Sequence, residues 1–234
     1  MASRLPIVIP STGITRFAWH RLLIIIFTLS LSACENISEL SELQKATELA
    51  LFGNPDIAIE RADIDKLPYA SIRAKMGRSG RVIMILGRYD GPDLHWISAD
   101  SVAVATRRGR IVKSSGLPET LNTTIYDGVD PIGLRERQWD TPIATRRFID
   151  IEPGAHYGVT VIGKIEQTGV EEIEILGHRY QTIVLRERGY AAQLDWSFEN
   201  YFWLDMKTGF VWKSIQHITP SLPPFEIEIL KPAG

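Results

Sequence analysis

Residues 156–188 read HYGVTVIGKIEQTGVEEIEILGHRYQTIVLRER, and their pattern is the strongest indication of the fold class. Its first ten residues alternate, so that Val159 and Val161 share one side of an extended strand. Two further strand-like runs flank Leu176-Gly177-His178, which is typical of a tight hairpin. The stretch therefore predicts antiparallel strands joined by short turns.

The sequence on both sides of this stretch has the same character. Short runs of β-branched and aromatic residues are bounded by Gly, Pro, Asn or Asp, as is typical of strands. We expect such strands at residues 57–59, 82–86, 101–106, 110–113, 141–151, 196–205, 210–217 and 225–230. Seven or more short strands at near-regular spacing predict a mainly β, antiparallel protein.

Helices are expected only near the N-terminus. Ser38 can cap a helix that ends near Gly53, and a second short helix is predicted over residues 67–76. One helical turn is expected at 117–121, whereas the segment 127–137 is rich in Asp, Gly and Pro and predicts a loop. We find no internal repeat and no linker. Residues 34–234 are therefore expected to form one β-rich domain with an N-terminal tether or helix.

Residues 1–33 have the composition of a secretory signal peptide. Three arginines and no acidic residue precede an apolar run of 12 residues that ends at Ala33. A membrane-spanning helix needs about 20 residues, so we expect this run to be removed. Leu31, Ser32, Ala33 and Cys34 resemble a lipobox, which implies cleavage before Cys34 and attachment of acyl chains there. The alternative is a buried cysteine after an ordinary signal peptide.

Cys34 is the only cysteine of the chain, so no intramolecular disulfide can form. Each buried methylene of an acyl chain contributes about 0.8 kcal/mol, and two or more chains anchor a protein stably. Glu35, not aspartate, follows the cysteine. By analogy with the enterobacterial sorting rule, we expect anchoring at the outer membrane, facing the periplasm.

Charge and motifs argue against nucleic-acid binding and against catalysis. Residues 34–234 carry 23 basic and 28 acidic side chains, a formal charge of −5. That balance disfavours binding to a phosphate backbone. The chain has no nucleophile elbow, no zinc-protease motif and no phosphate-binding loop. We therefore expect no catalytic residue, no metal and no cofactor besides the covalent lipid. A glycan-modifying hydrolase with two facing carboxylates is the less favoured alternative.

Two groups of residues could bind a ligand. Arg107, Arg108 and Arg110, with Lys113 nearby, could contact the carboxylates of an acidic glycan. The simpler interpretation is a solvated hairpin turn. Seven aromatic residues between 196 and 212 could stack on sugars, but their strand spacing favours a place in the core. Two of them, Trp203 and Trp212, are expected to pack across facing strands.

Several stretches together resemble the YjbF/GfcB family of lipoproteins, which are encoded with exopolysaccharide and group 4 capsule genes. They are LPYA (67–70), WISAD (96–100), RGRIVKSSGL (108–117), FWLD (202–205), TGFVWKS (208–214) and ILKP (229–232). The resemblance implies bent, coiled sheets with short N-terminal helices. It implies a non-enzymatic role in exopolysaccharide or capsule production, beside an outer-membrane β-barrel partner and a periplasmic partner. A glycan-binding module is the alternative.

Overall fold

A computed structural model describes residues 59–132, 134 and 139–234. The predictions for the signal peptide, Cys34 and the first helix lie outside the described residues. Within the described ranges, no helix is both long enough and apolar enough to cross a membrane.

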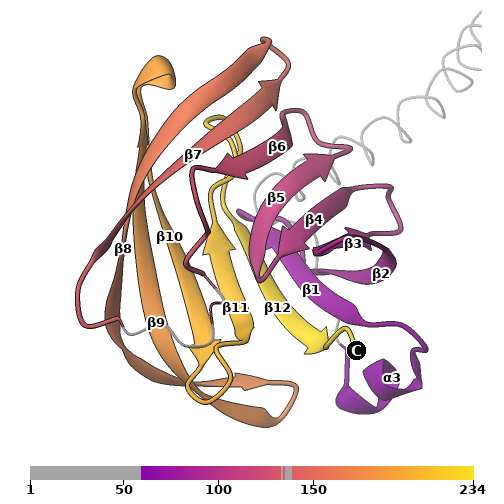
Figure 1. Cartoon of the computed structure of the whole chain (residues 1–234). Coiled ribbons are helices and arrows are strands. Elements are labelled where there is room, and N and C mark those ends of the chain that lie inside the picture. The colour runs from indigo at the N-terminus through magenta and orange to yellow at the C-terminus, as the bar shows by residue number, and fades with distance from the viewer. Residues whose placement is uncertain (1–58, 133, 135–138) are drawn as a thin grey trace, which may run out of the picture. The chain divides into compact units, whose positions relative to one another are not determined.

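The described chain is built almost entirely of strands, which confirms the prediction of a mainly β protein (Figure 1). Twelve strands are present in these residues: β1 (Ser71–Met76), β2 (Val82–Asp90), β3 (Asp93–Ile97), β4 (Ala103–Arg107), β5 (Arg110–Ser115), β6 (Thr120–Tyr126), β7 (Ile143–Glu152), β8 (His156–Ile175), β9 (His178–Ala191), β10 (Trp196–Asp205), β11 (Val211–Gln216) and β12 (Phe225–Lys231). The helical segments are α3 (Arg61–Lys66) and the 3-10 helix η1 (Ala192–Leu194).

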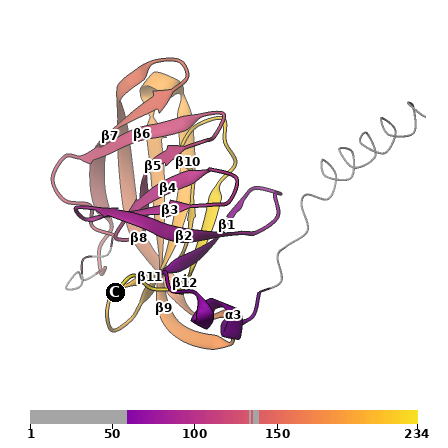
Figure 2. The same ribbon diagram turned by 90° about the vertical axis from the view of Figure 1, so that its right-hand side faces the viewer.

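The strands form one sheet in the order β5-β4-β3-β2-β1-β12-β11-β10-β9-β8-β7-β6, with every neighbouring pair antiparallel. Consecutive strands are neighbours except β5 and β6, which are the two edges of the sheet. A short connection, residues 116–119, nevertheless joins these edges. The sheet must therefore curl until its edges meet, and Figures 1 and 2 show this nearly closed shape. Leu121 N donates a hydrogen bond to Ser114 Oγ (2.9 Å) across the seam between them.

The predicted helix over residues 67–76 is wrong, because its second half forms β1. Ile72 and Ala74 are buried on one face, whereas Arg73 on the other face donates to Glu228. This is the period of two that a strand imposes. Pairing with β2 on one side and β12 on the other outweighs the helical preference of the sequence.

Two other local predictions have different outcomes, and one strand was not foreseen. The helical turn expected at residues 117–121 is wrong, since β6 begins at Thr120 and pairs with β7. The strand β3 was not predicted at all. Residues 127–132 and 134, the described part of the expected loop, contain neither helix nor strand.

Buried apolar side chains form two clusters inside the curled sheet. The larger cluster joins both halves of the sheet: Ile72, Ala74, Met84, Trp96, Val104, Ile111, Leu121, Ile149, Ile151, Val159, Val161, Ala191, Phe198, Ile218, Leu222, Phe225 and Ile227. The smaller one contains Ile132, Ile165, Leu185, Phe202, Leu204 and Val211. Of the seven aromatic residues expected in the core, Phe198 and Phe202 are buried there, whereas Phe210 is 38% exposed.

A third apolar cluster lies on the outer face, beneath α3 and the tip of the β8–β9 hairpin. Trp203 belongs to it because it alternates along β10 with the inward-facing Phe202. The expected pair of Trp203 with Trp212 is not formed: a register shift places Trp203 opposite Lys213, and Trp212 stacks on Tyr180 with ring centroids 3.9 Å apart.

Candidate functional site

The four basic residues of the β4–β5 hairpin have different surroundings. Arg110 is only 2% exposed. Arg107 is held by Asp93 in a bidentate pair, with Nε–Oδ1 and Nη2–Oδ2 distances of 2.6 and 2.9 Å. Arg108 and Lys113 are exposed and have no ion partner among the described residues. The structure therefore separates one structural arginine from a group of surface cations.

The turn between β4 and β5 explains this separation. Arg107 pairs with Arg110, which leaves Arg108 and Gly109 as a two-residue turn with φ of 50° and 88°. A Cβ atom on Gly109 would lie 2.5 Å from Val211 Cβ, so only glycine allows the turn to approach β11 this closely. Gln216 Nε2 also donates to the carbonyl oxygen of Gly109 (2.8 Å). Arg108 is thus presented from an anchored turn.

Arg110 belongs to a buried charge cluster, which we define as Arg110, Asp130, Arg147 and Glu187. Arg110 Nη1 donates to Glu187 Oε2 (2.9 Å), and Arg147 Nη1 donates to Glu187 Oε1 (2.5 Å). Arg110 Nε also donates to Asp130 Oδ2 (2.5 Å). Two cations and two anions give the cluster no net charge, as its burial requires.

Electrostatics keep Glu187 ionised inside the protein. Burial by itself would raise the pKa of Glu187, but Arg110, Arg147 and a hydrogen bond from Asn200 lower that pKa to about 2. A carboxylate with this pKa is no proton donor near neutral pH. The guanidinium carbons of Arg110 and Arg147 lie 5.1 Å and 5.5 Å from the ring centroids of Phe202 and Phe198. The buried charge cluster therefore connects the two inner apolar clusters and has a structural role.

A hollow of about 420 Å³ opens at the seam between the edge strands β5 and β6. We call it the basic groove. Its walls come from the ends of β3 and β4, from β5, from β6 and from the segment after β6: Pro92, Asp93, Arg107, Arg108, Val112, Lys113, Thr123, Thr124, Ile125, Tyr126, Gly128, Val129, Asp130 and Ile132. The structure thus brings Arg107, Arg108 and Lys113 together on one surface, as the sequence suggested, and leaves Arg110 beneath it.

The carboxylates of the basic groove are already engaged. Asp93 is paired with Arg107, and Asp130 with Arg110. The positive charges of Arg108 and Lys113 remain uncompensated among the described residues. This arrangement can attract an anion, but it offers no free pair of carboxylates for acid–base chemistry.

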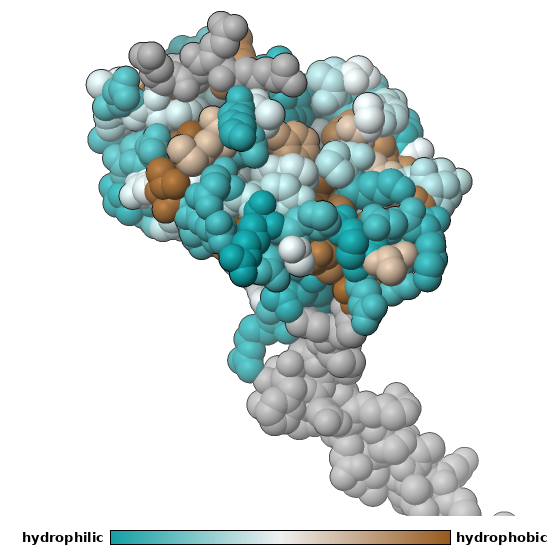
Figure 3. Space-filling model, turned by 90° about the horizontal axis from the view of Figure 1, so that it is seen from below, coloured by the Kyte–Doolittle hydropathy of each residue, from teal (hydrophilic) through white to brown (hydrophobic). Residues whose placement is uncertain are grey.

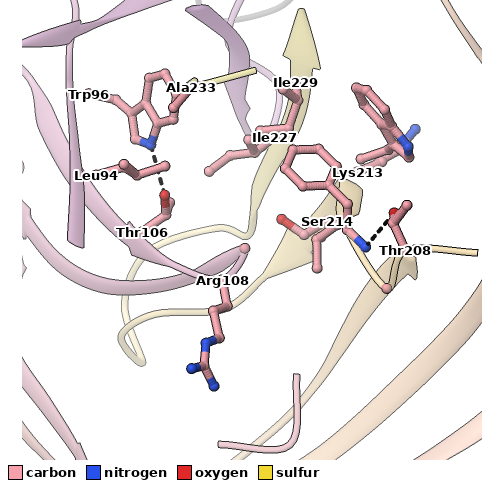
Figure 4. A pocket seen from close by; sticks show the side chains of 15 residues that line it. Leu94, Trp96, Thr106, Arg108, Thr208, Lys213, Ser214, Ile227, Ile229 and Ala233 are labelled. Atoms are coloured by element: carbon pink, nitrogen blue, oxygen red, sulfur yellow. Dashed lines mark hydrogen bonds between the residues drawn. The ribbon is translucent and has the colours of Figure 1, made fainter. Parts of the chain in front are cut away.

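An apolar pocket of about 210 Å³ lies on the other side of the same turn (Figure 4). Trp96, Ile227 and Ile229 line it, and Trp96 Nε1 donates to Thr106 Oγ1 (2.8 Å). Arg108 lines this pocket as well as the basic groove, but its guanidinium points away from the apolar side chains in Figure 4. The aliphatic part of the Arg108 side chain therefore borders the apolar pocket, while its guanidinium is available to the basic groove.

A second hollow of about 400 Å³ lies beside the β7–β8 turn, and none of its lining residues is a cation: Leu117, Pro118, Thr120, Glu152, Pro153, Gly154, Ala155 and Tyr157. Seen from below, the molecule is mostly hydrophilic with small, separate hydrophobic patches (Figure 3). No three His, Cys, Asp or Glu side chains of the described residues are placed to hold a metal ion. His217 illustrates this, because its Nδ1 contacts the carbonyl oxygen of Glu199 (2.9 Å) instead.

Glu187, Arg147 and Asp130 are functional-site residues that the sequence patterns did not predict. A signal for Glu187 was present: it lies two residues after the core residue Leu185 and so shares its inward-facing side of β9. A charged residue in the apolar phase of a strand indicates a buried ion pair. Its partners could not be found in this way, because they are 77 and 40 residues away in sequence.

Comparison with known proteins gives a consistent result. The family model described as "Group 4 capsule polysaccharide lipoprotein gfcB, YjbF" matches residues 44–230. The uncharacterized lipoprotein GfcB of Escherichia coli (strain K12) is 26% identical over 212 residues, which cover 91% of this chain and 98% of GfcB. The uncharacterized lipoprotein YjbF of the same organism is 23% identical over 210 residues, with 90% and 97% coverage.

A solved structure shares the fold. The crystal structure of the hypothetical lipoprotein YmcC from Escherichia coli (K12) superposes with a TM-score of 0.66 at 24% sequence identity, covering 81% of this chain and 95% of YmcC. Since the family model spans most of the sequence, the chain belongs to the YjbF family of group 4 capsule polysaccharide lipoproteins.

Proposed function

We propose that this protein is a lipid-anchored, non-enzymatic accessory component in the production or export of an exopolysaccharide or capsule. The observation that carries the proposal is membership of a capsule lipoprotein family along residues 44–230. In this proposal Cys34 bears the lipid at the outer membrane, and the β-rich domain faces the periplasm. Its partners are an outer-membrane β-barrel protein and a periplasmic protein of the same system.

The geometry of the basic groove favours binding over catalysis. A glycoside hydrolase needs two facing carboxyl groups, one of which donates a proton. The two carboxylates of the groove, Asp93 and Asp130, are each engaged by an arginine. Glu187 is buried, and its contacts with Arg110 and Arg147 keep it ionised. This arrangement supports an accessory role.

Deletion of the gene tests the proposed function. Secreted polysaccharide is measured in the wild type, in the deletion strain and in the strain complemented with the intact gene, under conditions that induce polysaccharide synthesis. We expect the deletion to lower the yield or change the composition, and the complementing gene to restore both. An unchanged polysaccharide in the deletion strain would refute the role.

Cys34→Ser tests the anchor separately. Without the sulfur atom no thioether can form, so we expect the variant to stay unprocessed or to leave the membrane fraction. Immunoblots of separated inner-membrane, outer-membrane and soluble fractions provide the measurement. A variant that is processed and still membrane-bound would exclude the lipid anchor. Wild-type protein found in the inner membrane would overturn the proposed sorting.

A further inference from the structure

We propose that the basic groove binds an acidic saccharide, whose carboxylates are held by Arg108 and Lys113. This inference rests on the proposed function and deepens it, because it assigns a ligand class and a binding surface to an accessory protein. Arginine and lysine are the side chains that hold a carboxylate by charge-assisted hydrogen bonds.

The charges in and below the groove support an anionic ligand. Arg107 and Asp93 neutralise each other, and the buried charge cluster carries no net charge. Arg108 and Lys113 are the cations of the groove that have no ion partner within the described residues. The surplus of positive charge therefore belongs to the groove itself, although the chain as a whole is acidic.

The other groups on the walls suit the polar and apolar faces of a sugar. Thr123 adds a hydroxyl group to the lining, whereas the Tyr126 hydroxyl accepts a hydrogen bond from Arg147 Nη1 (3.3 Å). Thr124 Oγ1 is buried without a hydrogen-bond partner in the described part of the chain. Ile125 and Val129 are 59% and 66% exposed at the same groove. Sugar rings combine hydroxyl groups with apolar C–H surfaces, so they can use both kinds of contact.

The size and rigidity of the groove also fit a small ligand segment. Its volume of about 420 Å³ falls within the range of about 300–1,000 Å³ that is common for small-molecule sites. Arg108 is presented by the turn that Gly109 and Gln216 anchor, and Arg107 is fixed by Asp93. The backbone that carries Arg108 therefore needs little ordering when a ligand binds, and the ordering is confined to the exposed side chains of Arg108 and Lys113.

An extended peptide is a weaker candidate for the same place. A peptide that adds to a sheet edge needs the free backbone groups of an edge strand. Side chains already engage two such groups at the seam: Ile111 N donates to Gln216 Oε1 (3.0 Å), and Leu121 N donates to Ser114 Oγ (2.9 Å). Recognition by cations and hydroxyl groups therefore agrees better with the structure than strand addition.

Binding of a galacturonic acid hexamer tests the inference. The full chain in detergent is titrated with the hexamer at low salt, and the affinity is measured by calorimetry. The variant Arg108→Gln/Lys113→Gln is compared with Arg88→Gln/Lys207→Gln. The control removes two exposed cations that have no ion partner in the described residues and that lie outside the groove. We expect the groove variant to bind at least about tenfold more weakly, and the control to bind like the wild type.

Two other ligands sharpen the test. The methyl-esterified hexamer has the same sugar backbone without charge, and we expect no binding. A glutamate hexamer carries the charge on a peptide, and we expect weaker binding than that of the sugar. Equal affinity for both acidic hexamers would overturn the saccharide assignment, and equal losses in both double variants would overturn the groove assignment. Absence of binding to the wild type would refute this inference alone, because the deletion strain tests the proposed function independently.

Discussion

Arg108 and Arg110 lie two residues apart on one hairpin, yet they belong to opposite environments. Arg110 points into the curled sheet and is fully compensated by Asp130 and Glu187. Arg108 lies in the turn, where it is exposed beside the basic groove. The direction in which the backbone places the side chain, and not the residue type, therefore determines whether an arginine stabilises the fold or is available to a ligand.

The physical reason is the cost of burying charge. A guanidinium removed from water must recover several kcal/mol through partners, which is why the buried charge cluster has matched charges. An exposed cation remains solvated and has no such desolvation penalty, so it can stay unpaired until it binds an anion. Changes to the two sites should therefore differ in stability and in binding.

The largest effect is expected from Glu187→Gln. The substitution leaves Arg110 and Arg147 buried without their shared carboxylate, and we expect a loss of about 3–5 kcal/mol in the free energy of unfolding. Denaturant titration at neutral pH provides the measurement. The control is Glu172→Gln, whose pair with Arg179 is exposed and should contribute less than about 1 kcal/mol. Similar losses in both variants would contradict the distinction between buried and exposed pairs.

Acid should weaken the buried charge cluster through the same carboxylate. The pKa of Glu187 is about 2 in the folded protein and 4.5 is its ordinary value, so the unfolded state takes up the proton first as the pH falls. Stability contributed by Glu187 is therefore complete above about pH 4.5 and is lost between about pH 4.5 and 2, by roughly 3 kcal/mol. Unfolding free energies measured across this window should fall more steeply for the wild type than for Glu187→Gln. If the unfolding free energies of the two proteins fell in parallel with pH, titration of Glu187 could not be the cause of the loss of stability in acid.

Gly109→Ala should destabilise the β4–β5 turn that lies between Arg108 and Arg110. The new methyl group would meet Val211 at a residue whose φ is 88°, so we expect a loss of about 2–3 kcal/mol. Gly91→Ala is a matched control, because its φ of 57° is also positive but no atom lies within 4 Å of the added Cβ. The control should lose only about 1 kcal/mol in denaturant titration. Equal losses would show that the close approach to β11 does not matter.

The smallest effect on stability is expected from Arg108→Gln/Lys113→Gln. Neither side chain has an ion partner among the described residues, so the unfolding free energy should change by less than about 0.5 kcal/mol. The same denaturant titration gives the value. A loss of several kcal/mol would mean that these cations have a structural role, and it would remove the contrast with Arg110.

Much of the fold could be predicted from local patterns. Alternation in residues 156–165 and the Leu176-Gly177-His178 turn correctly indicated antiparallel strands, which are β8 and β9 in the structure. The segment 71–76 was misassigned as a helix, because a run of this length fits either period and only pairing with β2 and β12 selects the strand. Three of the four cations suggested as a cluster do line one groove. The fourth, Arg110, could not be placed without its distant partners.

The β character, most of the hairpin turns, the family and the lipobox-like segment ending at Cys34 could be recognised without the structure. These properties depend on residues that are close together in the sequence, because periodicity, turn residues and short motifs are local patterns. Only the tertiary structure decided that the edge strands β5 and β6 meet, that a groove opens at their seam, and that Glu187 joins Arg110 to Arg147. These features depend on contacts between residues far apart in the chain, which form only when the whole sheet curls upon itself.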